Sequence, residues 1–117
     1  MKIGIPAFGT TLNSYVEPRF SRAHYFLILN KKGDLREVIK NPASQITRGA
    51  DDLASRTIIE NAIRVLLVSD INPRAFQILE SGGVKVYQAE RGLTVKEIFD
   101  LYKKNLLQRL KSSPEIE

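Results

Sequence analysis

The fold is decided by the segment RVLLVSDINP at residues 64–73. Its first six residues form an almost continuous apolar run, which predicts a strand over Arg64–Ser69 that is buried on both faces of a sheet. Asn72-Pro73 then predicts the start of a helix, because asparagine caps helices and proline fits the first helical position, where its missing N–H costs nothing. A doubly buried strand followed closely by a helix is typical of a parallel strand–helix–strand unit.

The residues after this segment complete that unit and add a last helix. The helix is expected to stop at Gly82-Gly83, and Val84–Tyr87 predicts the strand that follows it. Thr94 and Glu97 match a capping box, in which each side chain bonds the backbone N–H of the other residue. An apolar stripe at helical spacing then predicts one continuous helix through Val95, Ile98, Phe99, Tyr102, Leu106 and Leu110.

The residues before the segment predict an antiparallel hairpin and a further helix. Lys2–Ala7 is apolar and β-branched, which favours a short buried strand. His24–Asn30 and Leu35–Lys40 lie on either side of a short polar turn and predict a hairpin. Over Gly49–Glu60 apolar residues recur every three or four positions, so we expect an amphipathic helix, with Asn61 as its left-handed stop.

These elements define an α/β domain. Their order is strand, hairpin, helix, strand, helix, strand and helix. Two consecutive strand–helix–strand units require parallel strands with right-handed crossovers, whereas the hairpin is antiparallel. We therefore expect a mixed five-stranded sheet covered by helices, one domain over residues 1–111 and a tail at 112–117.

The composition excludes most routes to catalysis. The 117 residues include no cysteine and one histidine, which removes disulfides, thiolate metal sites and cysteine nucleophiles. The histidine, His24, begins an apolar strand, and the sequence has no Gly-x-Ser-x-Gly elbow and no glycine-rich phosphate loop before a helix. We expect no catalytic residue and no metal held by the protein's own ligands. The absence of cysteine and of any run as long as a membrane-spanning helix favours the cytoplasm.

The loops after the first, fourth and fifth strands are the best candidates for a binding site. Ligands of open sheets lie beyond the carboxyl ends of parallel strands, where helix N-termini offer free N–H groups and the positive end of a dipole. Forked guanidinium groups suit multiply charged anions. Arg74 and Arg91 fit ordinary surface charge better than Arg19 and Arg22, which flank Phe20 just before a strand. The arginines in or near these loops are Arg19, Arg22, Arg48, Arg74 and Arg91.

The net charge of +5 is concentrated near the C-terminus. Residues 91–111 hold six basic and two acidic side chains. We interpret them as the solvated outer face of the last helix, and binding of nucleic acid by this helix is the alternative.

The segment RFSRAHYF at residues 19–26 resembles the motif His-Phe-Gly-Arg-Ala-x-Tyr-Phe. Together with further matches in the same order, it makes the chain similar, from Met1 to about Leu107, to the dinitrogenase iron–molybdenum cofactor biosynthesis family. That family includes NifX-like domains and the C-terminal domain of NifB. The further matches are Asn41-Pro42-Ala43, Asn72-Pro73-Arg74-Ala75, Gly83–Tyr87 and Thr94–Glu97.

The resemblance implies a three-layer ribonuclease H-like fold, with sheet order 3-2-1-4-5 and helices on both faces. It also implies a non-catalytic carrier of an iron–molybdenum or other metal–sulfur cluster, with an acceptor protein as partner. The family's cluster binding is associated with the histidine of this motif, and many members have a second histidine before the first helix. This chain has Arg19 and Arg48 at those places, and Ser21 replaces the glycine of the motif.

A protonated guanidinium donates hydrogen bonds and does not ligate metals. We therefore expect arginines and loop amides to capture an anionic cluster, a thiometallate or an oxyanion. The expected cofactor-binding residues are Arg19, Phe20, Arg22, Arg48, Gly49 and Asn72.

Two alternatives stay open. The implied fold also hosts nucleases, which need acidic metal ligands on the first and neighbouring strands. Here the first strand has no carboxylate and Asp70 is the one acidic residue at a central strand end, so nucleic-acid binding without catalysis is the form of this alternative that remains. The other is a protein–protein interaction domain whose ligand site is vestigial.

Overall fold

The computed structural model describes residues 1–111 and contains a mixed sheet with the strand order β3-β2-β1-β4-β5. The central strand β1 pairs antiparallel with β2 and parallel with β4. The β2–β3 hairpin is antiparallel and β4–β5 is parallel, so the predicted order and directions are confirmed. The expected tail at 112–117 lies outside the described residues. The strands are β1 (Lys2–Ala7), β2 (Tyr25–Leu29), β3 (Leu35–Lys40), β4 (Ile63–Val68) and β5 (Lys85–Gln88).

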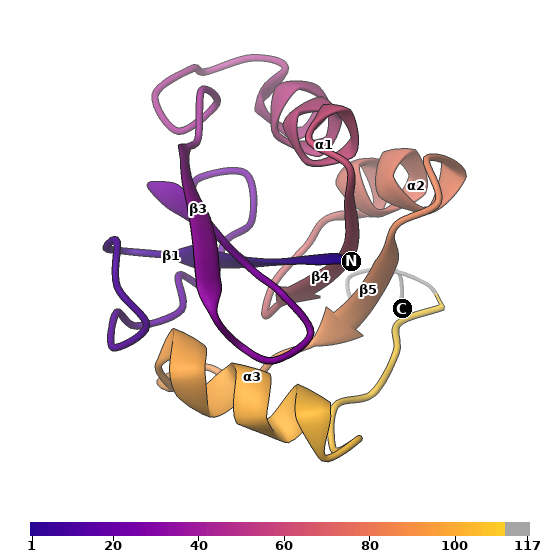
Figure 1. Ribbon diagram of the computed structural model, residues 1–117. Coiled ribbons are helices and arrows are strands. Elements are labelled where there is room, and N and C mark those ends of the chain that lie inside the picture. Colours follow the sequence, from indigo (N-terminus) through magenta and orange to yellow (C-terminus); the bar gives the residue numbers. More distant parts are fainter. Residues whose placement is uncertain (112–117) are drawn as a thin grey trace.

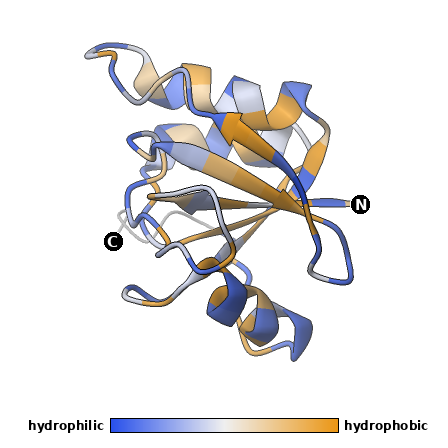
Figure 2. Cartoon of the chain, turned by 60° about the vertical axis from the view of Figure 1, so that its left-hand side comes forward, coloured by the Kyte–Doolittle hydropathy of each residue, from blue (hydrophilic) through white to orange (hydrophobic). Residues whose placement is uncertain are grey.

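Helices cover both faces of the sheet and give the three layers that the resemblance implies (Figure 1). Helices α1 (Ala50–Glu60) and α2 (Pro73–Ser81) lie on one face, and α3 (Val95–Lys103) lies on the other. Successive side chains of a strand point to opposite faces, so Ile28 of β2 joins the core under α1 and α2 while Leu27 joins the core against α3. Figure 2 shows the hydrophobic strands between helices whose outer sides are largely hydrophilic. None of the helices within residues 1–111 is long and apolar enough to cross a bilayer.

The predicted helix starts are confirmed by their caps. The Asn72 side chain accepts a hydrogen bond from the Ala75 N–H at 3.0 Å, and Pro73 occupies the first helical position of α2. Thr94 and Glu97 form both bonds of the capping box at the start of α3. Each cap satisfies N–H groups that the helix cannot bond internally.

The last helix is shorter than the apolar stripe predicts. It ends at Lys103, where Asn105 adopts a left-handed conformation with φ of 60°. The Asn105 N–H donates to Tyr102 O at 3.0 Å, and the Leu106 N–H donates to Leu101 O at 2.9 Å. These two bonds form a Schellman motif, which closes a helix and reverses the chain.

The chain after α3 returns along the outer edge of β5. The Gln88 N–H donates to Gln108 O at 2.8 Å, and the Leu110 N–H donates to Val86 O at 2.8 Å. Leu110 packs against the core under α1 and α2, on the face of the sheet opposite to α3. The predicted continuation of the helix through Leu106 and Leu110 is therefore wrong, because these leucines follow the turn.

The end of α1 also differs from expectation. The left-handed residue is Ala62, with φ of 60°, whereas Asn61 has φ of −91°. The Asn61 side chain instead donates to Thr57 O at 2.8 Å and so caps a carbonyl of the last turn.

Candidate functional site

The three loops expected to form the site are bonded to one another at the carboxyl edge of the sheet. The Val16 N–H in the loop after β1 donates to Leu93 O in the loop after β5 at 2.9 Å. Residues 18–20 run beside the start of the loop after β4, where the Phe20 N–H donates to Asp70 O at 3.2 Å and the Asp70 N–H donates to Pro18 O at 2.8 Å. These bonds bring the three loops together at this edge, but of the five arginines named in or near them only Arg19 and Arg22 line the cavity described next.

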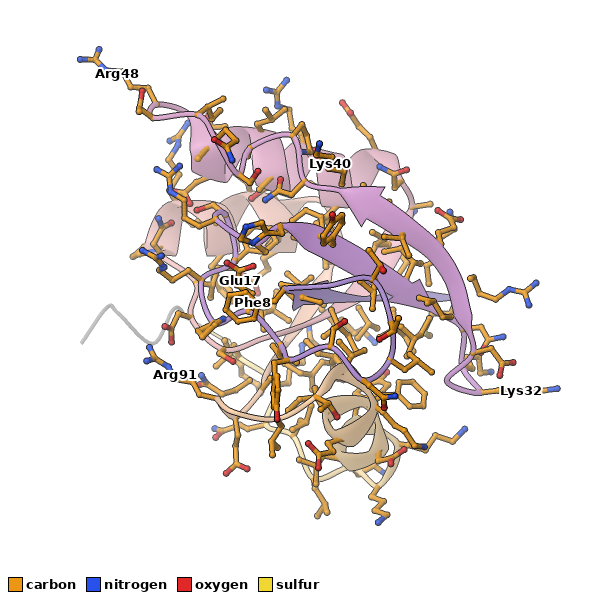
Figure 3. The ribbon with its side chains drawn as sticks, turned by 90° about the vertical axis from the view of Figure 1, so that its left-hand side faces the viewer. Phe8, Glu17, Lys32, Lys40, Arg48 and Arg91 are labelled. Carbon is orange, nitrogen blue, oxygen red and sulfur yellow. The ribbon has the colours of Figure 1, made fainter. Side chains whose placement is uncertain are left out.

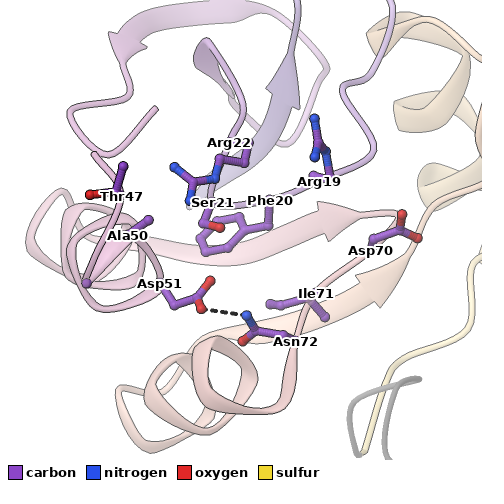
Figure 4. A pocket seen from close by; sticks show the side chains of 11 residues that line it. Arg19, Phe20, Ser21, Arg22, Thr47, Ala50, Asp51, Asp70, Ile71 and Asn72 are labelled. Atoms are coloured by element: carbon purple, nitrogen blue, oxygen red, sulfur yellow. Dashed lines mark hydrogen bonds between the residues drawn. The ribbon is translucent and has the colours of Figure 1, made fainter. Parts of the chain in front are cut away.

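A cavity of about 320 Å³ lies where residues 19–22 face the first turn of α1 and the residues that lead into α2 (Figure 4). Its lining is polar and charged around one buried aromatic ring. The lining residues are Arg19, Phe20, Ser21, Arg22, Thr47, Gly49, Ala50, Asp51, Asp70, Ile71 and Asn72.

Five of the six expected site residues line this cavity, and Arg48 does not. The Arg48 side chain extends from the tip of its loop away from the body of the protein (Figure 3). The five that line the cavity are Arg19, Phe20, Arg22, Gly49 and Asn72.

The two arginines of the cavity differ in their bonding. Arg22 is partly buried and its Nη1 donates to Ile46 O, which attaches the 19–22 segment to the loop before α1. Within residues 1–111, no side-chain or backbone acceptor bonds the exposed guanidinium of Arg19. Phe20 between them is 2% exposed, and its ring stacks on Phe26 with centroids 5.5 Å apart. The buried ring fixes the backbone from which both arginines project.

The N-terminus of α1 opens on the same cavity without a side-chain cap. Its N-cap is Gly49, with φ of 74°, a conformation that glycine adopts without strain. Ala50 and Asp51 of the first turn line the cavity. The first N–H groups of a helix and its dipole both favour an anion, so this turn adds to the positive potential of the arginines.

Two carboxylates also face the cavity, and each has a partner. The Asn72 Nδ2 donates to Asp51 Oδ2, so the cap of α2 also fixes the first turn of α1. The Asp70 carboxylate accepts a hydrogen bond from Arg91 Nη2. The lining thus holds two arginines and two aspartates, and its charge balance depends on groups just outside it.

Arg74 is held away from the cavity by its own ion pair. Its Nε and Nη2 lie 2.6 and 2.8 Å from the two oxygens of Asp52. The hydrogen bond from Arg74 lowers the pKa of the Asp52 carboxyl below its usual value, and the same bond raises the pKa of Arg74. This exposed pair joins α1 to α2 and fits the structural interpretation of Arg74.

Asn41 positions the segment that carries both arginines, a role that its sequence context does not reveal. It is 2% exposed, and its Nδ2 donates to Ser21 O at 3.1 Å and to Ala23 O at 2.8 Å. Its Oδ1 accepts from the Ala43 N–H at 3.0 Å. In the sequence, Asn41 stands out only as part of the Asn41-Pro42-Ala43 match to the family.

Glu17 is a second buried polar residue without a sequence signal. It is 6% exposed, and its Oε1 accepts from the His24 backbone N–H at 2.9 Å and lies 2.9 Å from His24 Nδ1. The imidazole is largely exposed beside Phe8, and His24 directly precedes β2, which begins at Tyr25 and not at His24 as predicted. Within residues 1–111, no three His, Asp or Glu side chains gather closely enough to hold a metal ion.

The fold defines the class of this protein. It is a three-layer α/β domain whose cavity lies at the carboxyl edge of parallel strands, where open sheets bind their ligands. The chain belongs to the dinitrogenase iron-molybdenum cofactor family, which matches residues 1–105.

Known proteins of similar sequence and structure cover nearly the whole chain. The apo form of the orange protein from Desulfovibrio gigas is 28% identical and superposes with a TM-score of 0.91. The match covers 97% of this chain and 96% of the orange protein chain. A NifB-like protein from Thermotoga, assigned to the DUF35 family, is 29% identical and has a TM-score of 0.82. The match covers 99% of this chain and 98% of the Thermotoga chain. An uncharacterized protein of Methanocaldococcus jannaschii is 25% identical over 112 residues, which are 93% of this chain and 91% of that protein. Membership in this family supports a role related to a metal cofactor.

Proposed function

We propose that this protein carries an anionic metal–sulfur cargo in the cavity between residues 19–22 and the N-terminus of α1, and catalyses no reaction on it. The cargo is an iron–molybdenum or other metal–sulfur cluster, or a thiometallate or oxyanion. One observation carries the proposal: the guanidinium of Arg19, which has no partner among residues 1–111, and the first turn of α1, which has no side-chain cap, line the same cavity. Membership in the cofactor family supports it.

The cavity's donor set fits an anion better than a bare metal ion. Guanidinium and backbone N–H groups offer only protons, and none of them can coordinate a metal. The two carboxylates that could do so are bonded to Asn72 and Arg91. Arg19 would donate to the cargo directly, and Arg22 would donate with the N–H groups that its bond to Ile46 leaves free.

The proposal is tested by titrating the purified protein with tetrathiomolybdate. Binding is measured by calorimetry and by the change in the visible absorbance of the anion. Arg19→Ala is expected to weaken binding by about tenfold to a hundredfold, because a hydrogen bond to a charged group contributes about 1.5–3 kcal/mol. Molybdate in a parallel titration separates recognition of sulfur from recognition of charge alone.

Arg48→Ala is the matched control, because Arg48 is an exposed arginine of a neighbouring loop that does not line the cavity. Its affinity is expected to stay within about twofold of wild type, since a screened and distant charge contributes little. Equal affinity of the Arg19→Ala and wild-type proteins, or no binding by wild type, contradicts the proposal. An acceptor protein and a cytoplasmic location stay predictions.

A further inference from the structure

Asp70 lies on the boundary between the cavity just described and a second one. The second cavity, of about 540 Å³, is lined by the end of β4 and the loop after β5, and it includes Arg91. Asp70 lines both cavities, whereas Arg91 lines only the second. The Asp70 side chain is 31% exposed, against 68% for Arg91, so the carboxylate is the more enclosed partner of the pair.

The charge of Asp70 opposes the cargo proposed for the first cavity. A half-enclosed carboxylate is screened less by solvent than a surface one, so it would repel an anion nearby. Arg91, which lines the second cavity and not the first, donates a hydrogen bond to this carboxylate. Arg91 therefore affects the electrostatic potential of the first cavity indirectly, through the charge and position of Asp70.

We propose that Arg91 is a positioning residue that makes the first cavity fit for an anion by neutralising Asp70 and holding its carboxylate toward the second cavity. This inference rests on the proposed function and deepens it. With Arg91 in place, Arg19 and Arg22 are opposed by Asp51 alone among the unneutralised charges, and Asn72 holds Asp51. Without Arg91, the positive charges of the two arginines and the negative charges of the two aspartates in the lining cancel.

A mutant cycle with tetrathiomolybdate affinity as its readout tests the inference. Arg91→Ala is expected to weaken binding by about three- to tenfold, as befits one uncompensated charge at a partly screened site. Asp70→Asn is expected to strengthen binding, because it removes the repulsion. In the Asp70→Asn background, Arg91→Ala is expected to change the affinity by less than about twofold, because Arg91 then has no carboxylate to neutralise. Arg91→Lys is expected to restore most of the affinity, since a single cation suffices.

The Asp52–Arg74 pair is the matched control. Arg74 is 69% exposed and Asp52 37%, close to the values for the Asp70–Arg91 pair, and neither residue lines either cavity. Arg74→Ala is expected to change tetrathiomolybdate affinity less than Arg91→Ala does, because neither member of this pair lines a cavity. Thermal unfolding of each variant shows whether an altered affinity reflects altered folding.

The outcomes separate the inference from the proposed function. Unchanged affinity in Arg91→Ala, while wild type binds and Arg19→Ala binds more weakly, overturns the inference alone. An equal loss from Arg91→Ala with and without Asp70→Asn also overturns it, because Arg91 would then contact the anion directly. Absence of binding by wild type overturns both.

Discussion

Asn41 shows how one buried side chain can determine where two surface arginines lie. Its amide bonds three backbone groups, two of them in the segment between Arg19 and the start of β2. A carbonyl or N–H group that loses such a partner inside a protein bears the full cost of its desolvation. The stability of the fold and the position of the arginines therefore depend on the same residue.

Replacing Asn41 with alanine is expected to destabilise the protein by about 2–4 kcal/mol, because it removes three hydrogen bonds in a site closed to solvent. Urea unfolding measures this change. The variant is also expected to bind tetrathiomolybdate more weakly under conditions where it is folded, since residues 19–22 lose their attachment to Asn41. Asn13→Ala, in an exposed loop, is the control and is expected to change stability by less than about 0.5 kcal/mol. A loss at Asn41 no larger than at Asn13 would contradict this account.

Individual site residues were predictable where the chemistry is local and not where it depends on burial. Arg19, Arg22 and the Asn72 cap follow from residue type and position in the chain. Asn41 and Glu17 are polar residues in loops, and nothing in the adjacent sequence shows that the fold encloses them. Arg48 adjoins Gly49 in sequence, but the direction of its side chain depends on the path of the whole loop.

The boundaries of the helices, too, were predictable where they depend on bonds between residues close in sequence. The starts of α2 and α3 were predicted correctly because each cap is a short motif whose bonds lie within four residues. The end of α3 was predicted wrongly because apolar spacing was extended across Asn105, a residue type that favours the left-handed turn which closes a helix. The apolar period says which face is buried, whereas the cap says where the helix stops.

Asn105→Val is expected to destabilise the protein by about 1–2 kcal/mol, because a left-handed backbone is strained for residues other than glycine, asparagine and aspartate. Asn105→Gly is expected to be neutral or stabilising. Guanidinium unfolding measures both. Lys104→Val is the control at the adjacent exposed position, where φ is −86° and valine meets no such strain. Equal stability of the Asn105→Val and Asn105→Gly proteins would show that the turn does not depend on this conformation.

At the scale of the whole molecule, chain topology was the most predictable property. Right-handed crossovers and an antiparallel hairpin leave few arrangements of these five strands, and the structure adopts the expected one. The same topology brought the loops of the site together. It could not show which arginine pairs with which aspartate, because ion pairs such as Asp70–Arg91 join residues 21 positions apart through the folded surface.

The distribution of charge over the molecule bears on the nucleic-acid alternative. The basic residues counted between 91 and 111 do not share a helix, because α3 ends at Lys103. On α3 itself Lys96 and Lys103 are matched by Glu97 and Asp100, and Lys96 Nζ lies 3.9 Å from Asp100 Oδ2. Arg91 is bonded to Asp70. The net charge of +5 is therefore spread over separate elements and forms no basic face on α3.

This spread of charge predicts weak binding of DNA and RNA. The logarithm of affinity for duplex DNA falls with the logarithm of salt concentration by about 0.9 for each phosphate contacted, so a protein with scattered cations should show a slope below about 2. At physiological salt, titration of a fluorescent duplex and a fluorescent single strand is expected to give no saturation below about 100 μM. Low-micromolar binding with a slope above about 4 would require a continuous basic surface and would favour the nucleic-acid alternative. Tetrathiomolybdate added to such a complex then tests whether the two ligands share a site. Displacement of the nucleic acid would indicate that both bind at Arg19, whereas no displacement would indicate separate sites.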